Sequence, residues 1–288
     1  MADDDSTTTN PRQRFFELAS IATADEPAKP EQLGLWPDDR RGAPNVLLRS
    51  ALFSAGKPTR TRKTFRDHQL AAQLSKNTGL KSVVYTGPQL YQPELDVWLE
   101  VVHRCRLRPA GVHSDFHVRG FLRSLRRSTG KSDYTQLVSQ FRLLKATSLD
   151  VTRSRPEGRP SRMKSLLQSV EYDEELGRWH VSIDEEIAEL FAPKEHTWLD
   201  FGARLELGRS YLAKWCHGYF SSHRKPYPVS VARLRDLSGS TTAELFRYRQ
   251  ALRAALAEVS RVEKQHRRRF TWSIDADDLV HVAHESGN

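Results

Sequence analysis

The chain contains very little cysteine: its 288 residues include only Cys105 and Cys216, which lie far apart in the sequence. A disulfide framework or a zinc site needs several such residues at suitable spacing, so neither is expected. No apolar run approaches the roughly 20 residues of a membrane-spanning helix, and the first residues lack the apolar core of a signal peptide. We therefore expect a soluble, cytoplasmic protein.

Motifs of the common enzyme classes are also missing. We find no glycine-rich loop followed by a lysine for phosphate binding, and no spacing of Ser, His and Asp that marks a nucleophile and its base. Residues 113–117 place three metal-capable side chains on one face if they form a strand. We favour the alternative, a helix start capped by Ser114 or Asp115, because no second His or Cys pair supports a metal. No enzyme, cofactor or metal is expected.

Positive charge is abundant and unevenly distributed. The chain has a formal net charge of +9, yet the stretch from His103 to Lys164 holds fifteen Lys and Arg against four Asp and Glu. The excess inside this stretch is larger than that of the whole protein, so the charge is concentrated in one region. Such a concentration favours a polyanionic partner, and nucleic acid is the first candidate.

The basic stretch has the pattern of a helix-turn-helix. Residues 116–130 and 131–145 read as two amphipathic helices around a short turn that contains Gly130. Two β-prone runs at 165–172 and 178–183 then flank a polar turn and predict a hairpin. Two helices followed by a hairpin are typical of a winged helix.

Three elements are predicted before this motif. Asn45 is placed to cap a short helix over residues 46–53, and residues 82–86 read as a strand. Residues 93–103 form a strongly amphipathic helix pattern that begins with a proline.

The same order recurs in the second half. A helix is predicted over residues 203–220, a short helix over 229–237, and a long helix from Thr241 to Val259. Strands at 267–274 and 279–282 predict a second hairpin. We therefore predict an α+β fold of two tandem winged-helix domains with a disordered amino-terminal tail. The predicted segments are residues 1–32 for the tail, 33–195 for the first domain and 196–288 for the second.

The helix at 131–145 is the first candidate recognition helix, because a helix of this width fits the major groove. A solvated basic face is the alternative interpretation; the following hairpin and the local charge favour DNA. Arg123, Arg126 and Arg127 are expected to contact the phosphate backbone, Ser128, Thr129 and Lys131 a phosphate at the helix start, and Gln136 and Gln140 the base edges.

The second candidate recognition helix starts at Thr241 and is less basic, so base contacts should matter more than bulk attraction. A packing or dimerisation helix is the alternative. The expected DNA contacts are Thr241, Glu244, Arg247, Gln250 and Arg253 on the helix and Arg267, Arg268 and Arg269 on the hairpin.

A short segment near the tail, Gln32, Leu33, Leu35 and Trp36, matches the form of peptides that bind bacterial sliding clamps. Such linear motifs can dock while they fold. The alternative, which we favour, is that Leu35 and Trp36 pack on the first domain.

Several short sequence blocks, spread over about residues 33 to 283, carry a family resemblance. The blocks are Leu35–Asp39, Pro44–Asn45, Arg49–Phe53, Tyr85–Gly87, Ile183–Ile187, Leu190–Ala192, Tyr219–Arg224, Pro226–Pro228 and Asp277–His281. In their order and spacing they resemble the TrfA family, the replication initiators of broad-host-range IncP plasmids.

The resemblance implies a plasmid initiator that binds repeated origin sequences (iterons), promotes opening of adjacent AT-rich DNA and recruits DnaA, the DnaB helicase and the sliding clamp. It also implies an active monomer in equilibrium with a homodimer. By the resemblance, residues of the second recognition helix fall on Gly239, Ser240, Tyr248 and Arg249. A transcriptional repressor built from the same modules is the alternative that DNA binding alone leaves open.

Overall fold

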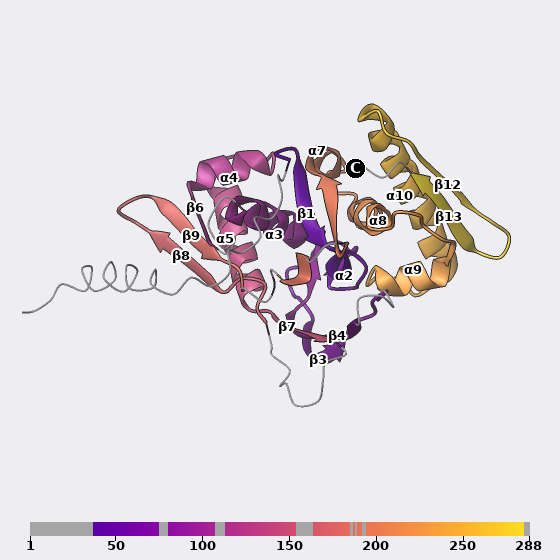
Figure 1. Cartoon of the computed structure of the whole chain (residues 1–288), viewed down its shortest axis with the longest axis horizontal. Helices are drawn as coiled ribbons and strands as arrows, with labels where there is room; N and C mark the ends of the chain where they lie inside the picture. The colour runs from indigo at the N-terminus through magenta and orange to yellow at the C-terminus, as the bar shows by residue number, and fades with distance from the viewer. Residues whose placement is uncertain are drawn as a thin grey trace, which may run out of the picture. The chain divides into compact units, whose positions relative to one another are not determined.

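The computed structural model describes residues 37–74, 80–106, 113–153, 164–184, 187, 189–191 and 194–284. The tail predicted over residues 1–32 and the clamp-like segment Gln32–Trp36 lie outside the described residues. None of the described helices is long and apolar enough to cross a membrane. Figure 1 labels the helices and strands that are named below.

The first winged-helix module is built around helix α3, which packs against helix α5 and against the strands β1 (Arg40–Pro44) and β6 (His113–Phe116) (Figure 1). Pro93 lies in the first turn of α3, and the Glu94 carboxylate accepts a hydrogen bond from the Tyr91 backbone N–H at 2.9 Å. Both features favour a helix start. The helices are α2 (Asn45–Leu48), α3 (Gln92–Cys105), α4 (Val118–Ser124) and α5 (Lys131–Lys145), with a 3-10 turn η3 at Glu189–Phe191.

The hairpin of this module is confirmed. Strands β8 (Ser169–Asp173) and β9 (Arg178–Ser182) pair antiparallel, and β6 (His113–Phe116) adds a third strand on the other side of β9. The helix pair α4–α5 is confirmed as well. The predicted cap at Ser114 or Asp115 is wrong, because both residues lie in β6 and α4 begins only at Val118.

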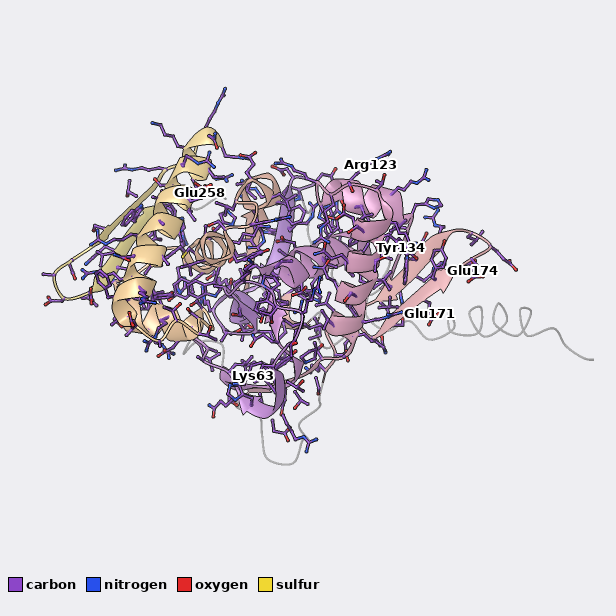
Figure 2. All side chains as sticks on the ribbon, turned by 180° about the vertical axis from the view of Figure 1, so that it is seen from behind. Lys63, Arg123, Tyr134, Glu171, Glu174 and Glu258 are labelled. Atoms are coloured by element: carbon purple, nitrogen blue, oxygen red, sulfur yellow. The ribbon has the colours of Figure 1, made fainter. Side chains whose placement is uncertain are left out.

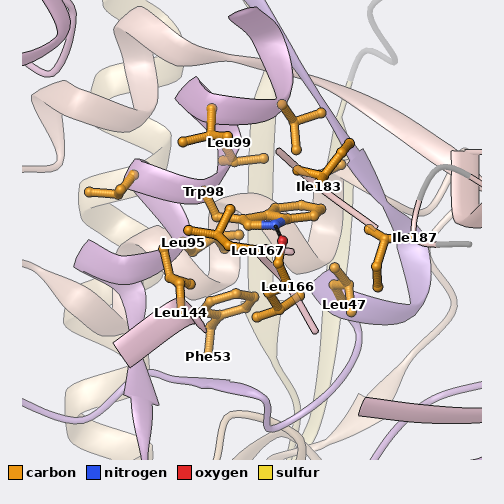
Figure 3. Packing of buried hydrophobic residues seen from close by; sticks show 14 of the residues in the cluster. Leu47, Phe53, Leu95, Trp98, Leu99, Leu144, Leu166, Leu167, Ile183 and Ile187 are labelled. Atoms are coloured by element: carbon orange, nitrogen blue, oxygen red, sulfur yellow. Dashed lines mark hydrogen bonds between the residues drawn. The ribbon is translucent and has the colours of Figure 1, made fainter. Parts of the chain in front are cut away.

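The first hydrophobic cluster surrounds Trp98 of α3, which is fully buried. Its indole N–H donates to the Leu166 backbone oxygen at 3.1 Å, as Figure 3 shows. A buried indole needs such a partner, because an unpaired N–H loses its hydration without compensation. Leu95 and Leu144 lie near the ring and join α3 to α5. This packing holds α5 at a fixed angle to the rest of the module.

A three-stranded antiparallel sheet also belongs to this module, in the order β3–β4–β7. The strands are β3 (Thr64–Gln69), β4 (Leu80–Pro88) and β7 (Ser148–Arg153). Only the middle strand was predicted, because Val83 and Tyr85 give it the alternation of a half-buried strand. Strand β3 is exposed along most of its length, so its sequence has no apolar period to detect.

The helix predicted over residues 46–53 is shorter in the structure and ends at Leu48. The Ser50 hydroxyl donates to the Leu47 backbone oxygen, and Phe53 enters the two-residue strand β2 (Phe53–Ser54). This strand pairs parallel with β5 (Leu90–Tyr91). Phe53 is buried in the first cluster, which the extended backbone allows it to reach.

The second winged-helix module has its own hydrophobic cluster, which includes Trp215, Tyr219 and Tyr248. Its helices are α7 (Phe201–Glu206), α8 (Tyr211–Ser221), α9 (Val231–Leu237) and α10 (Leu245–Gln265), and its hairpin is β12 (Phe270–Ile274) with β13 (Leu279–His284). Strand β11 (Val229–Ser230) pairs with the free edge of β13. The repeated order of helices and hairpin is confirmed.

Two of the predicted helices of this module differ from the structure by more than two residues. The single helix expected over residues 203–220 is interrupted at Gly208, whose φ of 54° lies in the left-handed region that favours glycine. The long helix starts at Leu245 rather than Thr241, because Glu244 has an extended backbone, and it continues to Gln265.

The two modules are joined by more than the connecting chain. Strand β1 (Arg40–Pro44) pairs antiparallel with β10 (His196–Asp200), which leads directly into α7. In addition, Asp96 of α3 forms buried ion pairs with Arg204 of α7 and Lys214 of α8. The boundary at residues 195 and 196 stays a prediction, and the strand that begins at His196 pairs with the first module.

Candidate nucleic-acid interface

Helix α5 presents two different faces. Leu137, Phe141 and Leu144 are buried in the first cluster and fix the orientation of the helix. The opposite face of α5 and the segments before the helix are exposed. They carry cations, polar groups and one amide side chain, that of Gln136, which was predicted to contact base edges. These exposed residues are Arg119, Arg123, Arg126, Ser128, Thr129, Lys131, Gln136, Arg142 and Lys145. The helix can therefore offer a basic surface to a polyanion.

Two exposed residues of this region, Arg126 and Ser128, contact carboxylates within the protein. Arg126 has a φ of 53° just after α4, and its guanidinium lies 3.5 Å from the Glu206 carboxylate of the second module. An exposed pair at this distance contributes little, roughly 0–1 kcal/mol, so a phosphate can replace Glu206 as the partner. The Ser128 hydroxyl donates to the Asp133 carboxylate in the first turn of α5.

Arg127 and Gln140, which were predicted to contact DNA, do not belong to the exposed surface, and their DNA contacts stay predictions. Gln140 is only 2% exposed, and its amide N–H donates to the Glu94 carboxylate at 3.2 Å. The Arg127 guanidinium donates to the Gln140 amide oxygen at 2.6 Å. Burial lowers the pKa of Arg127, although nearby acids oppose this effect. Both side chains therefore stabilise the packing of α5 on α3.

Helix α10 has one buried side and one exposed polar side, and the exposed side is the candidate DNA-contacting surface of the second module. Tyr248, Leu252 and Leu256 are buried, whereas the opposite side of the first three turns is exposed. That side carries Phe246, Arg247, Gln250 and Arg253 together with the small residues Ala251, Ala254 and Ala257. The Arg247 guanidinium pairs with Glu244 at 2.8 Å, three residues earlier, and both side chains are mostly exposed. Thr241 is exposed in the segment before the helix.

The positions that the family resemblance implied on α10 lie on its inner side. Tyr248 is 1% exposed, and its hydroxyl lies 3.2 Å from that of Ser238. Arg249 pairs with Asp278 at 3.0 Å and donates to the Asp275 backbone oxygen, so it holds the turn of the second hairpin against the helix. Ser240 is half-buried and its hydroxyl donates to Thr242. Arg249 therefore positions the hairpin, and a DNA contact by this residue stays a prediction.

The three arginines Arg267–Arg269 precede β12 and lie at the base of the second hairpin, not at its turn. Arg267 and Arg269 are exposed, whereas Arg268 contacts the Glu263 and Asp200 carboxylates at 2.5 Å. Burial would raise the pKa of Glu263, but hydrogen bonds from His217 and Arg268 outweigh it and hold this pKa at about 2. Arg268 therefore has carboxylate partners within the protein, and its contact with DNA stays a prediction.

The first hairpin is acidic near its turn. Figure 2 shows Glu171 and Glu174 on this hairpin, and Asp173 and Glu175 lie beside them in the sequence. Four carboxylates repel a phosphate backbone, so this hairpin is a poor candidate for DNA contact through its turn. The adjacent basic face of α5 remains the candidate in the first module.

The segment 113–117 forms strand β6 and the residue after it. The Asp115 carboxylate pairs with Arg178 at 2.7 Å, and the His117 ring lies 3.1 Å from the Gly177 backbone oxygen. Across the described ranges there is no group of three His, Cys, Asp or Glu residues arranged to hold a metal ion. Asp115 and His117 are thus engaged in holding β6 and the start of α4 against β9.

One exposed aromatic residue was not predicted from the sequence. Phe246 is 67% exposed in the first turn of α10, beside the predicted contacts Arg247 and Gln250. The signal was present: the ring interrupts the polar side of an otherwise regular amphipathic pattern. Arg119 and Arg142, both exposed, were likewise not among the predicted DNA contacts.

Two solved structures are similar to this chain, and the first of them has the same architecture. A crystal structure of domains 2 and 3 of RctB superposes with a TM-score of 0.52 at 11% identity, covering 85% of this chain and 98% of that one, which shows the fold. A crystal structure of the Pi initiator protein in complex with iteron DNA gives a TM-score of 0.49 at 12% identity, covering 67% of this chain and 92% of that one.

Sequence comparison is more specific. The plasmid replication initiator protein TrfA of Escherichia coli is 29% identical over 231 residues, which is 78% of this chain. The match spans 58% of the length of that relative. The model of the TrfA protein family matches residues 30–284, so that it includes both modules. The predicted resemblance is confirmed, and the chain belongs to the TrfA family.

Proposed function

We propose that this chain is a plasmid replication initiator that binds repeated origin sequences through the outward faces of α5 and α10. One observation carries the proposal: each module turns a long helix outward, and the exposed side chains on it are mainly cations and amides. These are the groups that neutralise phosphates and pair with base edges in the major groove. Membership of the TrfA family supports the role in initiation.

Helices α5 and α10 contribute differently to DNA binding. Around α5, Arg123, Arg126 and Lys131 are exposed and supply charge, which gives affinity that falls steeply with salt. On α10, Gln250 lies in the middle of the exposed face with Arg253 one turn later, and these side chains are suited to direct base contacts. Sequence preference should therefore depend on α10 more than on total charge.

The connection between the modules supports binding to one continuous site. The β1–β10 pairing and the buried pairs of Asp96 with Arg204 and Lys214 hold the two modules together. A protein with two coupled helices fits only those sites in which the two contacted segments have the matching separation. An origin repeat of fixed length meets this requirement.

Beyond DNA binding, we propose that the protein promotes opening of adjacent AT-rich DNA and recruits host replication proteins, with DnaA, the DnaB helicase and the sliding clamp as candidates. We also propose an equilibrium between a DNA-binding monomer and a homodimer. Family membership and the name of the Escherichia coli relative, a plasmid replication initiator, support a role in starting replication, and these steps extend that role.

The deciding experiment places the purified full-length chain on the origin region of its own replicon. Footprinting should show protected repeats, and a single-strand-specific nuclease should cut the neighbouring AT-rich segment only when the protein is bound. The chain supplied in trans should also support replication of an origin plasmid. Protected repeats without nuclease sensitivity or replication would identify a repressor instead, and the absence of sequence-specific protection would contradict the DNA-binding proposal itself.

A further inference from the structure

Phe246 occupies an unusual position for a large aromatic side chain. It is 67% exposed, more than any other large hydrophobic residue in the described part of the chain, and it lies in the first turn of α10. The second cluster is directly behind this helix, with Tyr248 buried two residues later. The helix therefore turns Phe246 outward, and folding of the module gains little from it.

The neighbours of Phe246 on the helix surface are polar. Residues four and seven positions apart share a helix face, so Phe246, Gln250 and Arg253 form one exposed stripe. The adjoining exposed positions are the small residues Ala254 and Ala257. Small side chains allow the helix backbone to approach a flat or grooved partner closely. The stripe thus combines an aromatic ring, an amide and a guanidinium on a helix whose backbone can approach a partner closely.

This combination matches the chemistry of one base pair type in the major groove. Thymine presents a C5-methyl group there, which apolar side chains contact, and its partner adenine presents the N6 and N7 atoms, with which a Gln amide can pair twice. The first turn of a recognition helix commonly reaches the base edges. Building on the function proposed above, we infer that Phe246 forms an apolar subsite for a thymine methyl group in the origin repeat, beside the base contact of Gln250.

A second copy of the chain is the alternative occupant of this surface. A stable protein interface buries about 800 Å² on each partner around an apolar centre. Phe246 is a single ring among Arg247, Gln250 and Arg253, and the other exposed large hydrophobic residues, Tyr172, Leu176 and Tyr227, lie on different elements. A lone ring framed by hydrogen-bonding groups fits a base edge better than the centre of a dimer interface.

The test removes the methyl group from the DNA and the ring from the protein. Each thymine of the protected repeat is replaced singly by uracil, which lacks only the C5-methyl group, and affinity is measured for the full chain and for Phe246→Ala. The unmodified chain should bind about fourfold more weakly at one thymine position, the change expected for one buried methyl-sized group. Phe246→Ala should bind the thymine repeat about as weakly and show no further weakening with uracil at that position.

Two further variants sharpen the result. Phe246→Leu keeps an apolar side chain and should retain part of the preference for thymine. Leu176→Ala removes an exposed hydrophobic residue from the acidic hairpin and should leave the uracil profile unchanged. Thermal unfolding of Phe246→Ala should match that of the unmodified chain, because the ring is exposed.

The outcomes separate this inference from the proposed function. Specific binding with a uracil effect that persists in Phe246→Ala overturns the thymine subsite and leaves the initiator proposal intact. If Phe246→Ala loses the dimer in sedimentation experiments and keeps its DNA affinity, the ring serves self-association and the subsite is overturned as well. If the unmodified chain shows no sequence-specific binding, the proposed function fails first.

Discussion

The Asp96 carboxylate of α3 accepts a hydrogen bond from the Arg204 guanidinium of α7 at 2.7 Å, and neither side chain is more than 5% exposed. The second Asp96 oxygen contacts the Lys214 ammonium at 2.5 Å, and Arg204 also donates to the Gln92 amide oxygen at 2.8 Å. Burial would raise the pKa of Asp96, but Lys214 and Arg204 outweigh it and lower this pKa. One carboxylate thus connects two modules.

Replacing Asp96 by Asn should strongly destabilise the protein. The substitution leaves Arg204 and Lys214 buried without a counter-charge, and breaking a buried pair in this way costs about 3–5 kcal/mol. Denaturant unfolding measures the loss. The matched control is Glu258→Gln, which breaks an exposed pair with Arg261 and should change the unfolding free energy by less than about 0.5 kcal/mol. Equal stability of the two variants would show that Asp96 does not hold the modules together.

Replacing both Arg123 and Arg126 by Ala should weaken binding to every DNA sequence. Both side chains are exposed beside α5, and removal of each phosphate contact should reduce the slope of log affinity against log salt by about 0.9. Titrations at several salt concentrations on repeat and random DNA measure the slope. Arg127→Ala is the internal control: it removes the partner of Gln140, so it should lower the unfolding midpoint and leave the slope unchanged. A slope that responds only to Arg127→Ala would reverse this assignment.

Replacing Gln250 by Ala should relax sequence preference with little effect on non-specific binding. Removal of a bidentate base contact reduces discrimination by about 1–3 kcal/mol, and Gln250 is exposed in the middle of the α10 face. Competition between repeat and random DNA gives the ratio. Gln140→Ala should instead destabilise the fold and keep the ratio, because Gln140 is buried against Glu94. Equal weakening on both DNAs would show that Gln250 does not read a base.

Stability should fall as the pH drops from 6.5 toward 4. Burial and the nearby Arg49 lower the pKa of His223 to about 4, so the unfolded chain, with its ordinary pKa of 6.5, binds the proton first. The stabilisation associated with neutral His223 is therefore complete above pH 6.5 and is lost as the pH approaches 4. The loss at pH 5 amounts to roughly 1–2 kcal/mol.

Denaturant unfolding at pH 7 and pH 5 tests this expectation, with His223→Gln as the comparison. The variant cannot be protonated and should lose less stability over the same interval. His103, whose pKa burial lowers to about 3, titrates in the same direction and remains in both proteins. An identical pH dependence of the variant and the unmodified chain would rule out His223 as a source.

The sequence predicted elements whose burial follows a simple period. Helix α3, the pair α4–α5 and both hairpins show this, because their apolar positions recur every three to four or every two residues. It missed strand β3, which is mostly exposed, and the break at Gly208, where a backbone angle rather than a side chain interrupts the helix. The hydrophobic pattern reveals neither feature, because an exposed strand has no apolar period and the break at Gly208 follows from its backbone angle.

The sequence predicted which helices have an exposed polar face, but not which of their polar residues are exposed. Arg123, Lys131 and Gln250 are exposed as their polarity suggested. Gln140 and Arg268 have equally polar side chains, yet each is paired within the protein, with partners that include Glu94 and Asp200 far away in the sequence. The sequence contains no sign of these long-range pairs, so polarity alone could not tell which polar residues are exposed.

The pairing of β1 with β10 has a consequence for dividing the protein. A fragment that starts at residue 196 contains β10 without Arg40–Pro44, so one edge of that strand has unsatisfied backbone N–H and C=O groups. Exposed strand edges of this kind promote aggregation by pairing with other chains. The second module should consequently be made either with the first or together with a separate peptide that supplies β1, and a chain cut between the modules should stay assembled as two non-covalently associated pieces.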